Sequence, residues 1–178
     1  MRQQARRKDR PVIRGPICAA ILIATLSALP AGAQNVITQG GWEGFAMRDA
    51  DNKFDRCVLY NRSIQALTAS PYQMLGITRD PAGRIGLLIF YDPRALTRGE
   101  TTVTLKLDQR APISLPGDVL SDFHVNVTTL NGTAVAALRE AKTLEATVDG
   151  HSIRFELSDL DAALDRLETC IKIYGPKS

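Results

Sequence analysis

A cluster of acidic residues near the C-terminus is the first feature of this sequence that suggests chemistry. Residues 155–170, FELSDLDAALDRLETC, contain five acids and one cysteine. On a helix, Asp161, Asp165 and Glu168 would lie three or four residues apart and close to one face, where carboxylates can bind a metal ion or share a proton. Basic neighbours and the lack of any other type of ligand instead favour a hydrated, charged helix face. We predict neither a catalytic residue nor a metal ligand in this stretch.

The same stretch has the pattern of an amphipathic helix. Ser158 and Asp161 have the spacing of a capping box, and Asp159 and Asp161 fall in the first turn, where the helix dipole favours negative charge. Apolar residues recur with the spacing of one buried face, at Leu160, Ala163, Leu164, Leu167 and Ile171. Cys170 falls on that face. We therefore predict a C-terminal helix that packs on the rest of the domain.

A second acidic stretch, DADNKFD at residues 49–55, resembles a calcium-binding loop. It offers side-chain oxygens at Asp49, Asp51, Asn52 and Asp55. It lacks the glycine at the sixth position and the glutamate at the twelfth that an EF-hand loop requires. Because strand-like sequences flank it, we predict a polar hairpin turn.

The two histidines of the chain are His124 and His151. His124 falls on the outward face of a predicted strand, beside Asn126, and His151 follows a predicted turn. The sequence has no G-x-S-x-G or H-E-x-x-H motif, so neither histidine is tied to a nucleophile or a zinc site. We predict no catalytic residue, no metal site and no cofactor, and keep a hydrolase with an unrecognised site as one alternative.

Aromatic residues on predicted strands are candidates for lining a binding groove. Such residues more often belong to a hydrophobic core, so the ligand-binding residues stay unknown at this stage. The residues are Trp42, Phe45, Tyr60, Tyr72, Phe90 and Tyr91.

The first 33 residues have the three parts of a bacterial signal peptide. A basic start precedes an apolar run at residues 17–29, and Ala31-Gly32-Ala33 fits a small-residue cleavage site. The run is shorter than the roughly 20 apolar residues of a membrane-spanning helix. We predict cleavage after Ala33, no stable membrane span after removal of the leader, and a periplasmic or secreted domain. An uncleaved anchor is the alternative.

Removal of this leader changes the apparent charge of the protein. The whole chain has 22 Lys and Arg residues against 19 Asp and Glu residues. Residues 1–33 contain six of the basic residues and one acid, which leaves 16 basic and 18 acidic groups and a formal net charge of −2. The mature chain therefore offers no charge-based argument for binding nucleic acid.

Cysteine usage predicts one disulfide. Cys18 leaves with the leader, so Cys57 and Cys170 remain in a compartment where disulfides persist. Because these are the only two thiols left, we predict that they are bridged and that the bridge closes a loop spanning most of the domain.

Residues 34–178 are predicted to form a single domain made mainly of strands. Hairpin turns are expected at residues 49–53, at the DPAG sequence of residues 80–83 and at Asp149-Gly150. Residues 85–91, IGLLIFY, are apolar on both faces, which indicates a central strand covered on both sides.

Other strands alternate apolar and polar residues, as at residues 103–107, 123–127 and 153–157. An Ala-rich segment, residues 132–142, predicts a short internal helix. The predicted fold is an antiparallel β sandwich or a curved sheet, with that short helix and the C-terminal helix packed on it.

Taken together, several of these residues resemble a known family. Trp42 follows the leader, FDRCVLYN carries Cys57, VAALREAK supplies a short helix, and residues 155–170 end as F-x-L-x-x-x-x-A-A-L-x-x-L-x-x-C. This order resembles the bacterial exported proteins related to invasion-associated locus B. Two features depart from that family's pattern: a second cysteine pair is missing, and Ser158-Asp159 stands where a glycine is usual. The resemblance implies a periplasmic β-rich domain without catalytic residues.

The function expected from these observations is non-enzymatic binding of an unknown protein or envelope component. One alternative is a periplasmic inhibitor of a protease or lysozyme, with residues 91–100, YDPRALTRGE, as an exposed reactive loop. Loops on a rigid β scaffold commonly carry such functions.

Overall fold

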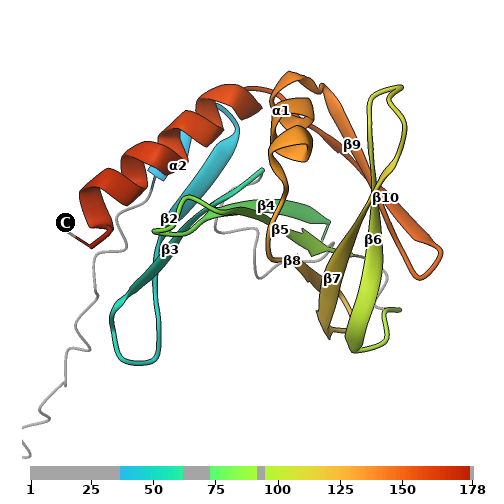
Figure 1. Cartoon of the computed structure of the whole chain (residues 1–178), viewed down its shortest axis with the longest axis horizontal. Helices are drawn as coiled ribbons and strands as arrows, with labels where there is room; N and C mark the ends of the chain where they lie inside the picture. The colour runs from blue at the N-terminus through green and yellow to red at the C-terminus, as the bar shows by residue number, and fades with distance from the viewer. Residues whose placement is uncertain (1–36, 62–72, 92–94, 177–178) are drawn as a thin grey trace, which may run out of the picture. The chain divides into compact units, whose positions relative to one another are not determined.

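The computed structural model describes residues 37–61, 73–91 and 95–176, and the predicted leader, residues 1–33, lies outside this part of the chain. The described residues form ten strands and two helices (Figure 1). In chain order these are β1 (Ile37–Gln39), β2 (Trp42–Arg48), β3 (Phe54–Tyr60), β4 (Met74–Arg79), β5 (Ile85–Phe90), β6 (Gly99–Leu107), β7 (Ile113–Ser121), β8 (His124–Val127), α1 (Gly132–Glu140), β9 (Thr143–Val148), β10 (His151–Glu156) and α2 (Leu160–Tyr174).

All ten strands belong to one antiparallel sheet. Their order is β1-β2-β3-β4-β5-β8-β7-β6-β9-β10, so β1 and β10 are the edge strands. The sheet curves strongly without closing into a barrel (Figure 1). Of the two predicted architectures, the structure has the curved sheet.

The three predicted hairpins are present, as β2–β3, β4–β5 and β9–β10. In the last of them Val148 pairs with His151 across a two-residue turn. Asp149 has a φ of 50° and Gly150 a φ of 80°. Positive φ at both turn positions is the geometry of the tight turn that matches the twist of two strands.

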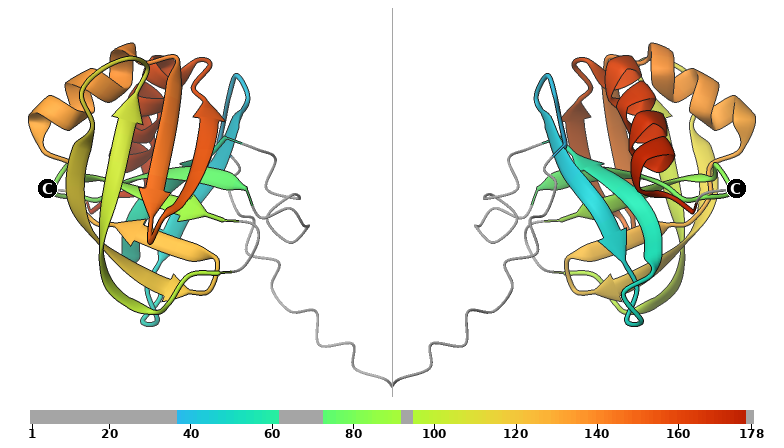
Figure 2. Two further views of the ribbon diagram at one scale, coloured as in Figure 1. Left: turned by 90° about the vertical axis from the view of Figure 1, so that its right-hand side faces the viewer. Right: turned by 90° about the vertical axis from the view of Figure 1, so that its left-hand side faces the viewer.

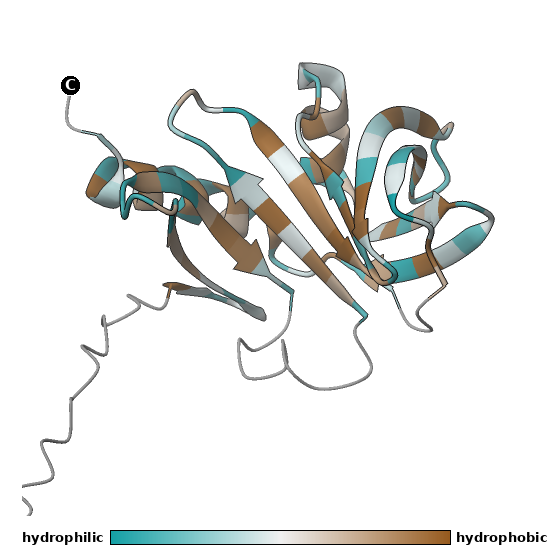
Figure 3. Cartoon of the chain, turned by 90° about the horizontal axis from the view of Figure 1, so that it is seen from below, coloured by the Kyte–Doolittle hydropathy of each residue, from teal (hydrophilic) through white to brown (hydrophobic). Residues whose placement is uncertain are grey.

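The main hydrophobic core lies between one face of the curved sheet and the two helices. α2 packs on β1, β2, β3 and β4, and it also contacts α1 (Figure 1). Of its predicted apolar face, Leu160, Ala163, Leu164 and Leu167 are buried, and Ile171 is partly buried. Seen from below, bands of apolar and polar residues alternate along several strands (Figure 3). This period of two assigns alternate side chains to opposite faces of the sheet.

A second, smaller cluster lies on the opposite face of the sheet. Val58, Tyr60 and Leu88 are its buried members, and Phe45, Met47 and Phe90 are partly buried against it. The predicted central strand, now β5, therefore has apolar contacts on both faces, because Leu87 and Ile89 enter the main core.

Two strands were not expected from the sequence. β1 has only three residues. β7 contains Pro116 and Gly117, residues that normally argue against a central strand. β8 pairs with β7 only between Asp118 and Ser121, so Pro116 lies where β7 has a partner on one side only. Proline is tolerated at such edge-like positions of a sheet.

Candidate functional site

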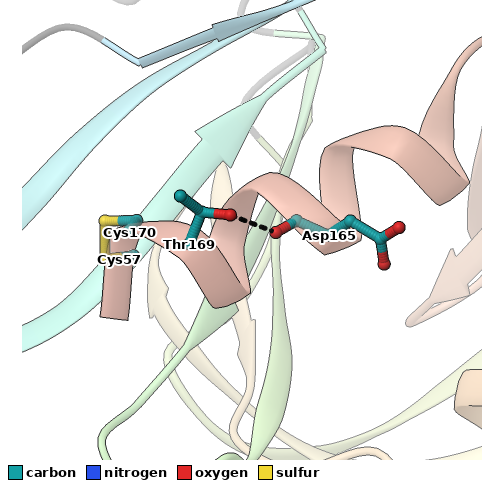
Figure 4. Close-up of a disulfide and its surroundings, with 4 residues drawn as sticks. All are labelled: Cys57, Asp165, Thr169 and Cys170. Atoms are coloured by element: carbon teal, nitrogen blue, oxygen red, sulfur yellow. Dashed lines mark hydrogen bonds between the residues drawn. A yellow bond between two sulfur atoms is a disulfide. The ribbon is translucent and has the colours of Figure 1, made fainter. Parts of the chain in front are cut away.

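The disulfide fastens α2 to the sheet. Cys57 of β3 and Cys170 of α2 are bridged, with their Cα atoms 6.2 Å apart (Figure 4). The two residues are 0% and 2% exposed. The predicted pairing is confirmed, and it links segments separated by 113 residues.

The start of α2 differs from the predicted capping box. The helix begins at Leu160, and the N-cap residue Asp159 has a φ of 58° and makes no side-chain capping hydrogen bond. A capping side chain acts from an extended backbone, which this left-handed conformation excludes. Asp159 instead packs on the turn between β1 and β2, where a Cβ added at Gly40 would lie 2.5 Å from its Oδ2.

The acids at the start of α2 form ion pairs with the other helix. Arg139 of α1 pairs with both Asp161 and Asp165. The hydrogen bond to Asp161 is the main reason that the pKa of Arg139 is raised. The predicted charged face is exposed, as expected, and it also forms ion pairs with the other helix. The sequence could not reveal these pairs because Arg139 belongs to a different element.

The last acid of the stretch is also paired. Glu168 lies 3.0 Å from Lys172 and 3.7 Å from Arg79 of β4. The hydrogen bond from Lys172, together with its charge, lowers the pKa of Glu168. Within the described residues, no group of three or more His, Cys, Asp or Glu side chains is placed to hold a metal ion.

The polar stretch between β2 and β3 forms the predicted hairpin turn. The Oδ1 atom of Asp49 accepts hydrogen bonds from the backbone N–H groups of Asp51 and Lys53. Asn52 has a φ of 61°, which an asparagine tolerates in a turn. The side chain of Asp49 is thus used to shape the turn.

The two histidines lie on strands that are far apart in the sheet order. β7, β6 and β9 separate β8, which carries His124, from β10, which carries His151. His151 is exposed. The ring of His124 stacks on Phe90 at 4.4 Å, and its buried Nε2 finds no hydrogen-bond partner in the described part of the chain.

Burial lowers the pKa of His124. The unfolded chain, with a histidine pKa near 6.5, therefore binds this proton more tightly than the folded chain does. We expect the free energy of unfolding to fall as the pH drops below about 6.5, by at most about 1.4 kcal/mol per pH unit for one group. Urea unfolding at about pH 7.5 and about pH 5.5, above the range in which carboxylates titrate, measures the difference.

His124→Phe keeps a ring against Phe90 and should remove this part of the pH dependence. His151→Gln, at an exposed position, is the matched control and should keep it. An unchanged pH dependence in His124→Phe would contradict the assignment to His124.

The candidate aromatic groove is divided between the two faces of the sheet. Trp42 and Tyr91 belong to the main core. Phe45, Tyr60 and Phe90 form a row on the opposite face, with ring centroids 6.4 Å and 6.0 Å apart. The remaining candidate, residue 72, lies outside the described residues.

The predicted reactive loop has two buried anchors. Tyr91 is 3% exposed and donates a hydrogen bond from its hydroxyl to the carbonyl of Ala146, and Leu96 is 6% exposed. Residues 92–94 lie outside the described part of the chain, and residues 97–100 are exposed. The prediction that the whole of residues 91–100 is exposed is therefore wrong at Tyr91 and Leu96.

Trp42 connects two segments that are far apart in the sequence. Its indole N–H donates a hydrogen bond of 2.8 Å to the carbonyl of Ser158, in the connection between β10 and α2. The side chain is 1% exposed. We call this contact the seam, because it brings the β1–β2 hairpin to the end of β10 (Figure 2).

A cavity of about 420 Å³, the seam cleft, opens beside this contact. Its walls come from the β1–β2 turn, the ends of β3 and β4, and the edge strand β10. They combine two aromatic rings with charged and uncharged polar groups. The lining residues are Gly41, Trp42, Asn61, Gln73, Arg154, Phe155, Glu156 and Ser158.

The polar wall of the cleft is held in place by the backbone. Asn61 accepts a hydrogen bond at Oδ1 from the N–H of Leu75, and its own N–H donates to the carbonyl of Leu75, both at 2.9 Å. A Cβ added at Gly41, on the opposite wall, would meet no atom within 4 Å. The cleft therefore has a fixed wall and open space in front of the turn. Apart from Trp42, no pattern in the sequence pointed to this cleft.

Neither α1 nor α2, the two helices described, combines the length and the apolar character needed to cross a bilayer.

Comparison with known proteins identifies a fold. No family model matches the chain, and no curated protein matches it. The crystal structure of invasion associated protein B from Bartonella henselae aligns with a TM-score of 0.53 at 16% sequence identity, over 78% of this chain and 97% of that one. At this identity the likeness is one of fold. The resemblance noted from Trp42, Cys57 and residues 155–170 is thereby confirmed: this chain has a fold similar to that of invasion associated protein B.

Proposed function

We propose that residues 34–178 are an exported, non-enzymatic binding domain that recognises a protein or envelope component in the seam cleft. The observation that carries this proposal is the composition of the cleft wall. Two largely buried aromatic residues, Trp42 and Phe155, line it together with amide and charged residues from both ends of the sheet. Binding sites typically combine apolar surface with a few placed polar groups in this way.

Two features support export. The basic start, the apolar run and the Ala31-Gly32-Ala33 sequence have the order of a signal peptide. The buried bridge between Cys57 and Cys170 is of a kind that persists in oxidising compartments. Both features support the proposed periplasmic or secreted location.

The groups in the cleft favour binding over catalysis. Its described lining includes neither a histidine nor a cysteine. His124 lies on β8 and stacks on Phe90, and His151 lies at the start of β10, outside the described lining of the cleft. Nucleophilic catalysis requires a nucleophile beside an oriented base, and such a pair is not among the groups that line this cleft.

The intrinsic fluorescence of Trp42 tests the proposal directly. Trp42 is the only tryptophan of the chain, so a ligand that enters the cleft should change its emission. Purified residues 34–178 are titrated with peptidoglycan fragments, lipopolysaccharide and peptides. Arg154→Glu, which reverses a charge in the cleft wall, should weaken the response. Lys106→Glu, at an exposed position on β6 outside the cleft, is the matched control.

A fluorescence response that Arg154→Glu and Lys106→Glu change equally would place the binding elsewhere. The same preparation is assayed with hydrolase substrates and against a panel of proteases and lysozymes. Turnover that is lost in His124→Ala or His151→Ala would contradict the non-enzymatic proposal, and inhibition at micromolar concentration would favour the inhibitor alternative.

A further inference from the structure

β10 is an edge strand, and one wall of the seam cleft is its free edge. Among the strands that the structure describes, it ends the strand order and pairs with β9 alone. An edge strand presents unpaired backbone N–H and C=O groups that can template another strand. Arg154, Phe155 and Glu156 of this strand line the cleft.

The register of the β9–β10 hairpin identifies which backbone groups face outward. Thr143 of β9 directs both its N–H and its C=O toward Asp108, on the side of β6. Glu156 is opposite Thr143 in the ladder. Because Thr143 directs its groups to the other side, Thr143 and Glu156 form a non-hydrogen-bonded pair. In such a pair of an antiparallel ladder, both residues direct their N–H and C=O groups away from each other. The N–H and C=O of Glu156 therefore point away from β9.

The same alternation extends along the strand in steps of two. The pair Val148 and His151 closes the tight turn, where the two residues exchange hydrogen bonds. Counting from either end, Ser152, Arg154 and Glu156 present their N–H and C=O groups to the free edge. Two of these three residues also line the cleft.

The shape of the cleft favours a single extended segment over a second folded copy. Its opposite wall is the protein's own β1–β2 turn, with Gly41 and Trp42. A single strand adds at about 4.8 Å from its neighbour and occupies only the width of one chain. A second copy pairing through its own β10 would bring a whole sheet against this turn.

The side chains of β10 define the preferred sequence of the segment. Arg154 and Glu156 are exposed on one face of the strand, and Phe155 between them is 4% exposed on the core side. Opposite charges directly across a ladder are favourable. An antiparallel segment would therefore place a basic residue opposite Glu156, then an apolar residue beside Phe155, then an acidic residue opposite Arg154.

We infer that the seam cleft binds an extended polypeptide segment of the pattern basic–apolar–acidic, which adds to the sheet as an antiparallel strand on the free edge of β10. This rests on the proposed binding function of the cleft and specifies its ligand class. Main-chain hydrogen bonds provide the affinity in this mode of recognition, and alternate side chains provide the selectivity.

A pair of substitutions at one position separates the backbone from the side chain. Arg154→Pro removes the outward N–H, and proline is tolerated on an edge strand where that group faces away from the sheet. Arg154→Ala removes the side chain but keeps the N–H. A random peptide display library is selected on immobilised residues 34–178, and the enriched peptides are synthesised and titrated by Trp42 fluorescence.

We expect the enriched peptides to share the basic–apolar–acidic pattern. Arg154→Pro should weaken their binding more than tenfold, and Arg154→Ala less than about fivefold, since exposed ion pairs contribute little. Peptides N-methylated at the residue opposite Arg154 should lose binding, whereas methylation at the next residue should not. This methylation scan uses the unaltered protein, so it decides the matter even if Arg154→Pro does not fold.

Four results would overturn the inference. Equal binding by Arg154→Pro and Arg154→Ala, with no effect of N-methylation, would exclude strand addition. A response of Trp42 to glycans or lipopolysaccharide but to no selected peptide would leave the binding function intact and remove the peptide. If no peptide is enriched and sedimentation analysis shows a dimer that Arg154→Pro dissociates, the occupant of the cleft would be a second copy of the chain. No response to any of these probes would overturn the proposed function as well.

Discussion

Replacing both bridged cysteines, Cys57→Ala with Cys170→Ala, should lower the free energy of unfolding by about 4 kcal/mol. The bridge spans 113 residues, and in the chain-entropy model a cross-link that closes a loop of about 100 residues restricts the unfolded chain by about 4.7 kcal/mol. For a domain of this size, the melting temperature should fall by roughly 10 °C. Thermal and urea unfolding of residues 34–178 measure both quantities.

Reduction provides the control for this experiment. A thiol reductant should destabilise the unaltered domain to a similar extent and leave the double variant unchanged. Intact mass after alkylation should show no free thiol in the exported protein. A double variant that unfolds within about 1 kcal/mol of the unaltered domain would mean that α2 stays on the sheet without the bridge.

Trp42→Ala should have an effect of similar size, about 3–5 kcal/mol on the free energy of unfolding. The side chain is 1% exposed in the main core, so its removal leaves a large cavity. It also deprives the carbonyl of Ser158 of its indole donor. Because the variant has no tryptophan, far-ultraviolet circular dichroism in urea is the suitable measurement.

Trp42→Phe separates the two contributions. It keeps an aromatic ring in the core but loses the hydrogen bond to Ser158, so we expect a smaller loss of about 1–3 kcal/mol. Equal losses in Trp42→Phe and Trp42→Ala would show that the hydrogen bond matters more than the packing. A loss below about 1 kcal/mol in Trp42→Ala would contradict the structural role of the seam.

The elements with strong local signals were predicted from the sequence. The turn at Asp149-Gly150, the apolar stripe of α2 and the two-sided β5 all depend on residues close together in the chain. The disulfide was predictable for another reason: the chain has three cysteines, and Cys57 and Cys170 are the two outside the predicted leader.

The elements with weak local signals were missed. β1 is too short to show a period, and Pro116 in β7 is acceptable only because β8 ends before reaching it. The helix start was predicted wrongly because Asp159 packs on Gly40, about 120 residues earlier in the chain. Each of these features is decided by a partner strand or turn that local patterns do not reveal.

The candidate site belongs almost entirely to the tertiary structure. Trp42 marked it in the sequence only as one aromatic residue among several. Curvature of the sheet brings Trp42 to Ser158 and turns the edge of β10 toward the β1–β2 turn. The acids of residues 155–170, in contrast, form ion pairs with Arg139, Lys172 and Arg79.

By itself, the sequence determined the class of the fold, its hairpins, its C-terminal helix and its single bridge, because periodicity, turn residues and cysteine number are properties of the chain. Only the tertiary structure decided how the sheet curves, which acids pair with which bases and where a cleft opens. The physical reason is that these depend on strand order and on contacts between residues more than a hundred positions apart, such as Trp42 with Ser158.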